Sequence, residues 1–162
     1  HHAKVWPGIS KQLNHQATAI AISKDKIVAL GNQFITSNDD DETFAHYYSA
    51  ERDSILSFIE RENIKGVIFL TGDRHFTEMS ALKNARGNWV YDLTTSSLTA
   101  GSYTGAEKEA NAHRVEGTLV DKHNFSILHF SGPRTNRELE IRNYDADGKQ
   151  LWTKTIAKEG PK

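Results

Sequence analysis

Apolar residues follow two different patterns in the first half of the chain. The run KIVALGNQFI at Lys26–Ile35 is rich in strand-forming residues and is followed by Thr-Ser-Asn, which predicts a buried strand. Residues Thr43–Asn63 instead repeat apolar side chains, from Phe44 to Ile59, with a period of about 3.6, which predicts a long helix. The continuous apolar run Val67–Thr71 predicts a second strand, covered on both faces. Strand, helix and strand in this order form a βαβ unit, so we expect the two strands to be parallel.

An acidic run, Asn38–Glu42, separates the first strand from the helix. It predicts a solvated loop in which Asp40 or Asp41 caps the helix that follows. A calcium-binding loop is an alternative interpretation, although the ligand spacing and the glycine of an EF-hand are absent.

The pattern changes after residue 76 to short apolar stretches separated by turn residues. Six strands are predicted, at Thr77–Leu82, Trp89–Thr95, His113–Val120, Asn124–Ser131, Arg137–Tyr144 and Gln150–Ala157. Asp145–Gly148 predicts a hairpin turn, and Ser97–Ala112, which has few large apolar residues, predicts a long functional or mobile loop. The whole chain, residues 1–162, therefore predicts one α/β domain in which a βαβ unit is followed by mainly antiparallel strands.

Composition excludes several classes of protein. With 20 Lys and Arg against 21 Asp and Glu, the net charge is −1, which does not fit a strongly basic nucleic-acid-binding protein. The absence of cysteine excludes disulfides, thiolate zinc sites and cysteine nucleophiles. No apolar run approaches the roughly 20 residues that span a bilayer, so neither a nucleic acid nor a membrane is an expected partner.

The chain opens with His1-His2-Ala3-Lys4 and has Met79 as its only methionine. We interpret this opening as a tag remnant or a cut end, and expect the chain to be the C-terminal portion of a larger domain.

Candidate chemistry lies where the second apolar strand ends, in GVIFLTGDRHFTEMS at Gly66–Ser80. In α/β sheets, the carboxyl ends of strands present the side chains that hold ligands. Asp73 and His75, two residues apart, would point to one side and offer a carboxylate and an imidazole to a metal ion. The alternative is an Asp–His pair that only orders a loop.

The segment FLTGDRHFTEMS at Phe69–Ser80, with LTTSSLTAG at Leu93–Gly101 and the tripeptide His123-Asn124-Phe125, resembles the C-terminal half of PhoD-like alkaline phosphatase/phosphodiesterases. These enzymes belong to the calcineurin-like metallophosphoesterase superfamily. Further matches are KIVALGNQF, the pattern Tyr-x-x-Glu-Arg that begins at Tyr48, and SGPRTNRELEIRNYDADGKQLW near the end. The resemblance covers residues 13–157 and is most specific between residues 66 and 101.

This resemblance implies part of a β-sandwich flanked by helices and a site with two metal ions, in which a metal-bound hydroxide hydrolyses phosphate mono- or diesters. By the match, His75 is a ligand of one metal ion, and Asp73 is a ligand of the other or of a bridging water. The superfamily usually has Gly-His-x-His here; this chain has Asp73 in place of the first His, as PhoD-like members do. A carboxylate favours Ca, Mn or Fe over a His-rich Zn pair.

The ligand blocks that precede this one in the family have no counterpart in residues 1–40. Because two ligands cannot hold a dinuclear site, we expect the isolated chain to be catalytically incomplete and its missing N-terminal half to be its partner. A PhoD-like parent also implies an extracytoplasmic location in a bacterium, periplasmic or secreted.

Four further residues are candidates for substrate binding or for supporting a ligand: Arg52, Thr95, Ser96 and His123. For Arg52 we favour a pair with a carboxylate over an anionic substrate, and for His123 a place in a turn. Arg74 would point away from Asp73 and His75 on an extended segment, which favours neither a structural nor a phosphate-steering role for it.

Two other functions remain open at this stage. One is a non-catalytic, β-rich binding or interaction domain; the other is a mononuclear metal hydrolase whose site is completed by His123 or Asp92. A Gly-x-Ser-x-Gly nucleophile elbow is absent. The remaining histidines with no metal-ligand spacing are His15, His46, His113 and His129, and the residues expected in the sheet core are Trp89, Tyr91 and Trp152.

Overall fold

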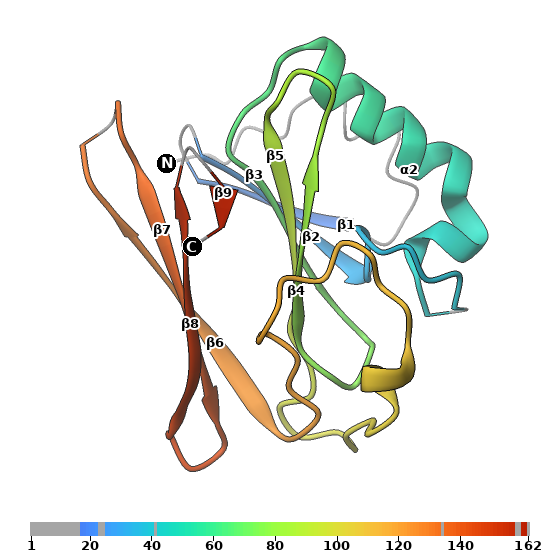
Figure 1. Ribbon diagram of the computed structural model, residues 1–162, viewed down its shortest axis with the longest axis vertical. Helices are drawn as coiled ribbons and strands as arrows, with labels where there is room; N and C mark the ends of the chain where they lie inside the picture. The colour runs from blue at the N-terminus through green and yellow to red at the C-terminus, as the bar shows by residue number, and fades with distance from the viewer. Residues whose placement is uncertain (1–16, 23–24, 41, 134, 158–159, 162) are drawn as a thin grey trace.

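The protein forms two β-sheets and one long helix in a computed structural model that describes residues 17–22, 25–40, 42–133, 135–157 and 160–161. The opening residues and His15 lie outside this part of the chain. The first sheet has the order β1 (Ala17–Ile22), β2 (Asp25–Asn32), β3 (Val67–Gly72), β5 (Trp89–Thr94) and β4 (Glu78–Lys83). The second has the order β6 (Asn124–Ser131), β7 (Glu138–Asp145), β8 (Gln150–Ala157) and β9 (Gly160–Pro161). Helix α2 (Phe44–Arg61) and the short 3₁₀ helix η1 (Ala106–Lys108) complete the fold (Figure 1).

The predicted βαβ unit is present, because β2 and β3 are parallel and α2 connects them. The strands after residue 76 pair mainly antiparallel, as expected; β5 is antiparallel to β4 but also pairs with β3 in parallel. After β3 the chain runs to the sheet edge as β4, turns tightly at Asn84–Asn88, and returns between the two strands. The chain reverses direction between β3 and β4 and again between β4 and β5. Strand β5 is therefore antiparallel to β4 and parallel to β3.

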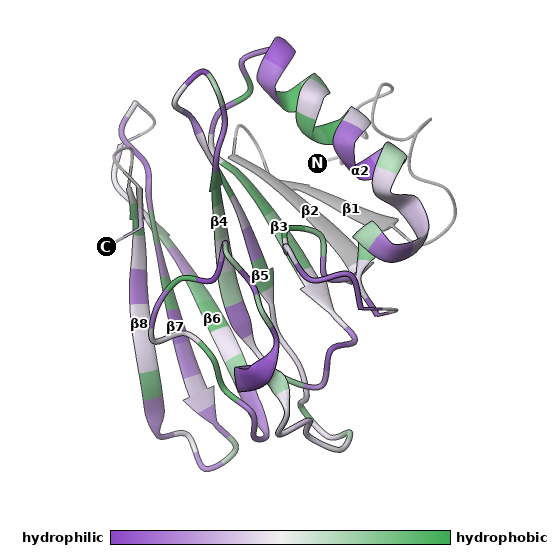
Figure 2. Cartoon of the chain, turned by 45° about the vertical axis from the view of Figure 1, so that its right-hand side comes forward, coloured by the Kyte–Doolittle hydropathy of each residue, from purple (hydrophilic) through white to green (hydrophobic). Residues whose placement is uncertain are grey.

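The five-stranded sheet is covered on both faces. Helix α2 covers one face, and the four-stranded sheet packs against the other (Figures 1 and 2). Along β3, Val67 and Phe69 pack with the helix, whereas Ile68 packs in the sandwich core, because successive side chains on a strand point to opposite faces. The sandwich core also contains the predicted core residues, with Tyr91 and Trp152 buried and Trp89 partly buried. The expected α/β sandwich flanked by a helix is confirmed.

Helix α2 is anchored by a narrow apolar face. Ile55 and Ile59 are each 2% exposed and pack with Phe34, Val67 and Phe69. Burying an isoleucine side chain contributes about 2 kcal/mol, so this face, rather than helix propensity, holds α2 on the sheet.

Three predicted boundaries are wrong. Strand β2 ends at Asn32 rather than at residue 35, because the amides of Phe34 and Ile35 leave the ladder and donate to the Asp92 carboxylate. Residues 113–120 form no strand; they run beside β4 with isolated bridges, of Arg114 with Ser80 and of Val120 with Thr77, and with single hydrogen bonds such as Val115 N–H to Met79 O. The residue that precedes α2 as its N-cap is Thr43, not Asp40.

The predicted hairpin at Asp145–Gly148 is confirmed and joins β7 to β8. Gly148 has a φ of 81°, a conformation that glycine adopts without the steric cost of a side chain. Within the described residues, no helix is both long and apolar enough to cross a membrane.

Candidate metal centre

The carboxyl ends of the three parallel strands meet at one edge of the first sheet. Asn32 at the end of β2 is paired with Gly72 at the end of β3, and the amide of Thr95, which follows β5, donates to Thr71 O at 2.9 Å. The loops that follow these strands therefore meet at this edge, which is where α/β sheets hold ligands.

The two predicted metal ligands follow β3 in an unusual backbone conformation. Asp73 and His75 have φ angles of 68° and 56°, in the left-handed region that side-chain-bearing residues rarely adopt. The sequence analysis had assumed an extended segment here, and that assumption is wrong. Asp73 is exposed, His75 is half-buried, and Arg74 between them is buried. The bend leaves both candidate ligands at the surface while Arg74 enters the interior.

His75 is held by hydrogen bonds to its backbone and to its ring. Its amide donates to Ser96 Oγ at 3.2 Å, and its carbonyl accepts from the amide of Tyr103 at 2.9 Å. Its Nδ1 lies 2.5 Å from Gly101 O. Because a carbonyl oxygen only accepts, Nδ1 carries the proton and Nε2 of the neutral ring presents its lone pair. Metal-ligating histidines are oriented by this kind of bond.

A network of buried polar groups fixes the loop that carries Ser96. The Thr77 hydroxyl donates to Asn124 Oδ1 at 2.7 Å and accepts from the Ser96 amide at 3.1 Å. Asn124 Nδ2 also donates to Ser96 O, at 3.0 Å. Since Asn124 begins β6 and Thr77 precedes β4, this network joins the two sheets directly beside His75.

His123 approaches the same loop as His75. Its Nε2 donates to Ala100 O at 2.8 Å, next to the carbonyl that His75 uses. The predicted loop at residues 97–112 is thus anchored by two imidazoles, and the turn position expected for His123 lies beside the site. Of the four supporting candidates, Ser96 contacts His75 through its hydroxyl, His123 contacts the 97–112 loop through its ring, and Thr95 is bonded to the end of β3 through its amide.

Arg74 has a structural role that the sequence did not suggest. It is 2% exposed, and its guanidinium donates to Asp40 Oδ1 at 2.5 Å and to Glu109 Oε2. Glu42 Oε2 lies 3.5 Å from Nη1, and the Phe76 ring lies beneath the guanidinium, 5.2 Å from its Cζ. One buried cation therefore joins the loop before α2, the loop after β3 and the 97–112 loop.

The acidic run before α2 supplies ion pairs rather than a calcium site. Asp40 is bound to Arg74, and Asp39 Oδ1 lies 3.4 Å from His46 Nδ1. Burial raises the pKa of Glu42; the nearby Arg74 lowers it, and the negative charge of Asp73 raises it further. Glu42 is therefore an acidic neighbour of the candidate centre that the sequence analysis did not identify, although its acidic run was visible.

A second acid near the site was also missed, and this one is buried. Glu78 is 1% exposed; its Oε1 accepts from Gln33 Nε2 at 2.5 Å and from Asn111 Nδ2 at 2.6 Å, and its Oε2 pairs with Arg114. It holds the 97–112 loop against β4. Its place in a strand that reads EMSALK gave no sequence signal of this role.

Asp92 lies inside the fold and not at a metal-accessible surface. It is 0% exposed; its Oδ2 accepts from the amides of Phe34 and Ile35 at 2.7 Å each, and its Oδ1 accepts from the Thr71 hydroxyl at 2.7 Å. Burial raises its pKa to about 7 in spite of these bonds. Its oxygens are engaged, so it does not complete a mononuclear site with His123.

Arg52 is placed apart from these loops, on α2. Its Nε and Nη2 donate to Asp53 Oδ1 at 3.1 and 3.0 Å, as expected of a structural pair. The same side chain lines a pocket that contains none of Asp73, His75, Ser96 or His123.

A family model described as PhoD-like phosphatase matches residues 8–144. The chain belongs to the PhoD-like phosphatase family. Among solved structures, the structure of PhoD matches this PhoD-like chain with a TM-score of 0.60 and 16% identity, covering 86% of this chain and 31% of PhoD. A double mutant of Vps29 from Entamoeba histolytica matches with a TM-score of 0.42 and 15% identity, covering 88% and 60%. No curated protein matches.

The PhoD-like chain spans about a third of the length of PhoD. Within the described residues, no group of three His, Asp or Glu side chains is arranged to hold a metal ion. Asp73 and His75 nevertheless fit such a group as two of its ligands, because the Gly101 bond takes the proton of the neutral His75 ring at Nδ1, so that Nε2 can accept, and because Asp73 is exposed two residues away. Further ligands would have to come from outside the described residues.

Proposed function

We propose that this chain forms part of a metal-dependent phosphoesterase that hydrolyses phosphate mono- or diesters. The observation that carries the proposal is the bond from His75 Nδ1 to Gly101 O, which leaves Nε2 of the neutral ring as the acceptor at the carboxyl edge of the parallel strands. Membership of a phosphatase family supports the reaction class.

His75 and Asp73 would hold the metal ions, as one nitrogen and one carboxylate ligand. When bound, divalent or trivalent ions such as Ca, Mn, Fe or Zn supply Lewis-acid activation of water and of the phosphoryl group. Ser96 fixes the position of His75 through the amide bond at 3.2 Å. Arg74 keeps the left-handed bend in place by joining it to Asp40 and Glu109, so that both ligands stay at the surface.

The remaining ligands would be supplied by a segment of the same domain that precedes these residues, or by a second chain. The proposal therefore assigns little or no activity to the 162 residues alone. It includes a small phosphoester as substrate and an extracytoplasmic location, as the family resemblance implies.

The test is hydrolysis of bis(p-nitrophenyl) phosphate and p-nitrophenyl phosphate by the natural gene product that carries this chain. His75→Ala should lower kcat/KM by about a hundredfold or more and should reduce the bound metal measured by mass spectrometry. His129→Ala, at an exposed position on β6, is the matched control and should retain both activity and metal.

Equal activity and metal content in wild type and His75→Ala would overturn the assignment of the site. Absence of activity in every protein, with metal still bound, would instead favour a binding or interaction domain.

A further inference from the structure

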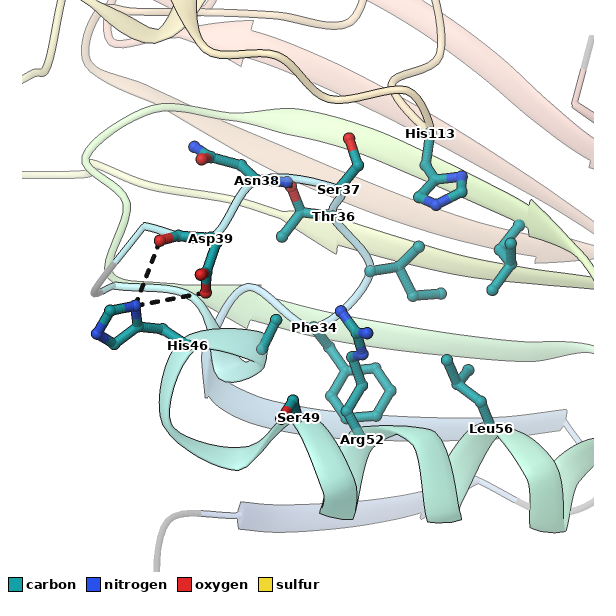
Figure 3. Close-up of a pocket in the computed structure, with 13 residues that line it drawn as sticks. Phe34, Thr36, Ser37, Asn38, Asp39, His46, Ser49, Arg52, Leu56 and His113 are labelled. Carbon is teal, nitrogen blue, oxygen red and sulfur yellow. Dashed lines mark hydrogen bonds and ion pairs between the residues drawn. The ribbon is translucent and has the colours of Figure 1, made fainter.

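A pocket of about 470 Å³ lies between α2, the segment that follows β2, and the turn that carries His113 (Figure 3). Its volume falls in the range of about 300–1,000 Å³ that is usual for small-molecule sites. None of the residues that line it belongs to the loops of the candidate metal centre after β3 and β5. An occupant of this pocket would therefore be distinct from a substrate bound at Asp73 and His75.

The pocket has a cationic end. Figure 3 shows the Arg52 side chain pointing from α2 into the space below His113. Arg52 is 24% exposed, and its two bonds to Asp53 use Nε and one N–H of Nη2, out of the five N–H donors of a guanidinium. Asp53 is 64% exposed, so this pair is of the solvated kind that contributes little free energy and exchanges readily for another anion.

His113 faces this charge and shows its effect. Burial lowers the pKa of His113, and the positive charge of Arg52 lowers it further. Of the residues that line the pocket, Asp39 is the single carboxylate, and its Oδ1 lies 3.4 Å from His46 Nδ1. The carboxylate beside the end of the pocket formed by Arg52 and His113 is therefore Asp53, which pairs with Arg52 and does not line the pocket.

Other parts of the pocket lining are apolar. Phe34 and Ile35 are 0% and 2% exposed, and Leu56 and Leu82 are partly buried beside them. Thr36, Ser37 and Ser49 add hydroxyl groups to the lining. A site with a cationic end, hydroxyl groups and apolar side chains suits a ligand that has an acidic head and a small apolar body.

We propose that this pocket binds a small organic anion, whose phosphate, phosphonate or carboxylate head lies between Arg52 and His113 and whose apolar body lies against Leu56 and Leu82. An anion in this position would be attracted by the guanidinium and would favour the protonated form of the imidazole. The proposal goes beyond the phosphoesterase function, because it concerns a different pocket and requires no metal ion.

The test is binding of phenylphosphonate to the 162-residue chain in the presence of EDTA, followed by NMR at the His113 ring and at the methyl groups of Leu56 and Leu82. Benzoate is the second probe and separates a carboxylate-preferring site from a phosphonate-preferring one, and inorganic phosphate tests the contribution of the apolar body. Benzyl alcohol is the neutral control. We expect saturable shifts at these residues with phenylphosphonate or benzoate, weaker binding of phosphate, and none of benzyl alcohol.

Arg52→Gln keeps much of the side-chain stem but removes the charge, and should weaken binding of the preferred probe by about tenfold or more. Arg61→Gln, at a 64% exposed position on the same helix, is the matched control and should bind within about twofold of wild type. In wild type, the anion should raise the pKa of His113 toward its ordinary value.

Equal affinities of Arg52→Gln and wild type would overturn the proposal, and so would shifts confined to residues 73–75 and 96–103. Where Arg52→Gln does not fold, the positions of the shifts in wild type still test the proposal. Failure here leaves the phosphoesterase proposal intact, since EDTA removes the metal ions on which that proposal depends.

Discussion

The imidazole of His75 donates from Nδ1 to the carbonyl oxygen of Gly101 across 2.5 Å. The two residues are 26 positions apart, and the bond closes the 97–103 loop over the bend that follows β3. Nδ1 is therefore hydrogen-bonded within the protein, and Nε2 of the neutral ring can accept a bond from a ligand. This relationship gives the candidate centre its orientation and leads to the first prediction.

His75 should exist as the Nδ1–H tautomer when it is neutral. Spectra of protein labelled with ¹⁵N-histidine should show a protonated Nδ1 and an unprotonated Nε2 at this residue. The exposed His129, in contrast, should show the tautomer mixture of a solvated imidazole, in which Nε2–H is usually preferred. A protonated Nε2 on neutral His75 would contradict the ligand assignment.

Replacing Arg74 by methionine should destabilise the fold by about 2–4 kcal/mol, because it leaves the acids around it without their buried cation. The value is below that of a fully enclosed pair, since Asp40 and Glu42 are 36% and 49% exposed. Arg74→Lys keeps the charge but loses the forked geometry, and should lie between methionine and wild type. Chemical denaturation provides the measurement.

The control for Arg74 is Arg86→Met at an exposed turn position, which should change the free energy of unfolding by less than about 0.5 kcal/mol. Equal stabilities of Arg74→Met and Arg86→Met would show that the buried ion pairs contribute nothing to the fold.

Asp92 should make stability fall as pH rises. The folded-state pKa is raised to about 7, above the ordinary value near 4, so between these values the folded protein holds a proton that the unfolded chain has released. The stability that comes from protonated Asp92 is full below pH 4 and is lost as pH rises through 7. The difference is on the order of 4 kcal/mol for a shift of about three units.

Asp92→Asn removes this titration while keeping the shape of the side chain. Its Oδ1 would accept from the amides of Phe34 and Ile35, and its Nδ2 would donate to the Thr71 hydroxyl. Unfolding free energies measured from pH 4 to pH 8 should therefore fall in wild type relative to this variant. Parallel pH profiles of the two proteins would contradict the raised pKa.

Asn124→Ala should cost about 2–3 kcal/mol, because the side chain is 2% exposed and its loss removes its buried bonds with the Thr77 hydroxyl, the Ser96 carbonyl and the Asn143 amide. The same variant should increase hydrogen exchange at the amide of His75, which donates to Ser96 Oγ. Asn136→Ala, at an exposed turn position, should alter neither measurement. If exchange at His75 stays unchanged, the network does not support the candidate centre.

The periodicities of the chain were enough to predict its local elements. The apolar period of α2, the runs at β2 and β3 and the turn at Asp145–Gly148 each follow from interactions within a few residues, and each is confirmed with small changes at the ends. Residues 113–120 were predicted as a strand because they form a short stretch bounded by turn residues. They run beside β4 without forming a continuous ladder, a tertiary outcome that local patterning does not contain.

The sequence by itself determined the βαβ unit, the family and the position of Asp73 and His75 after a buried strand, since these depend on neighbouring residues and on a recognisable motif. Only the tertiary structure decided that Arg74 is a buried ion-pair centre, that β5 inserts beside β3, and that Gly101 sets the tautomer of His75. Each of these relationships joins segments about 20 or more residues apart. They form because loops that are distant in the sequence meet at one sheet edge. At that edge a buried charge is paired with counter-ions, and a buried donor is bonded to an acceptor.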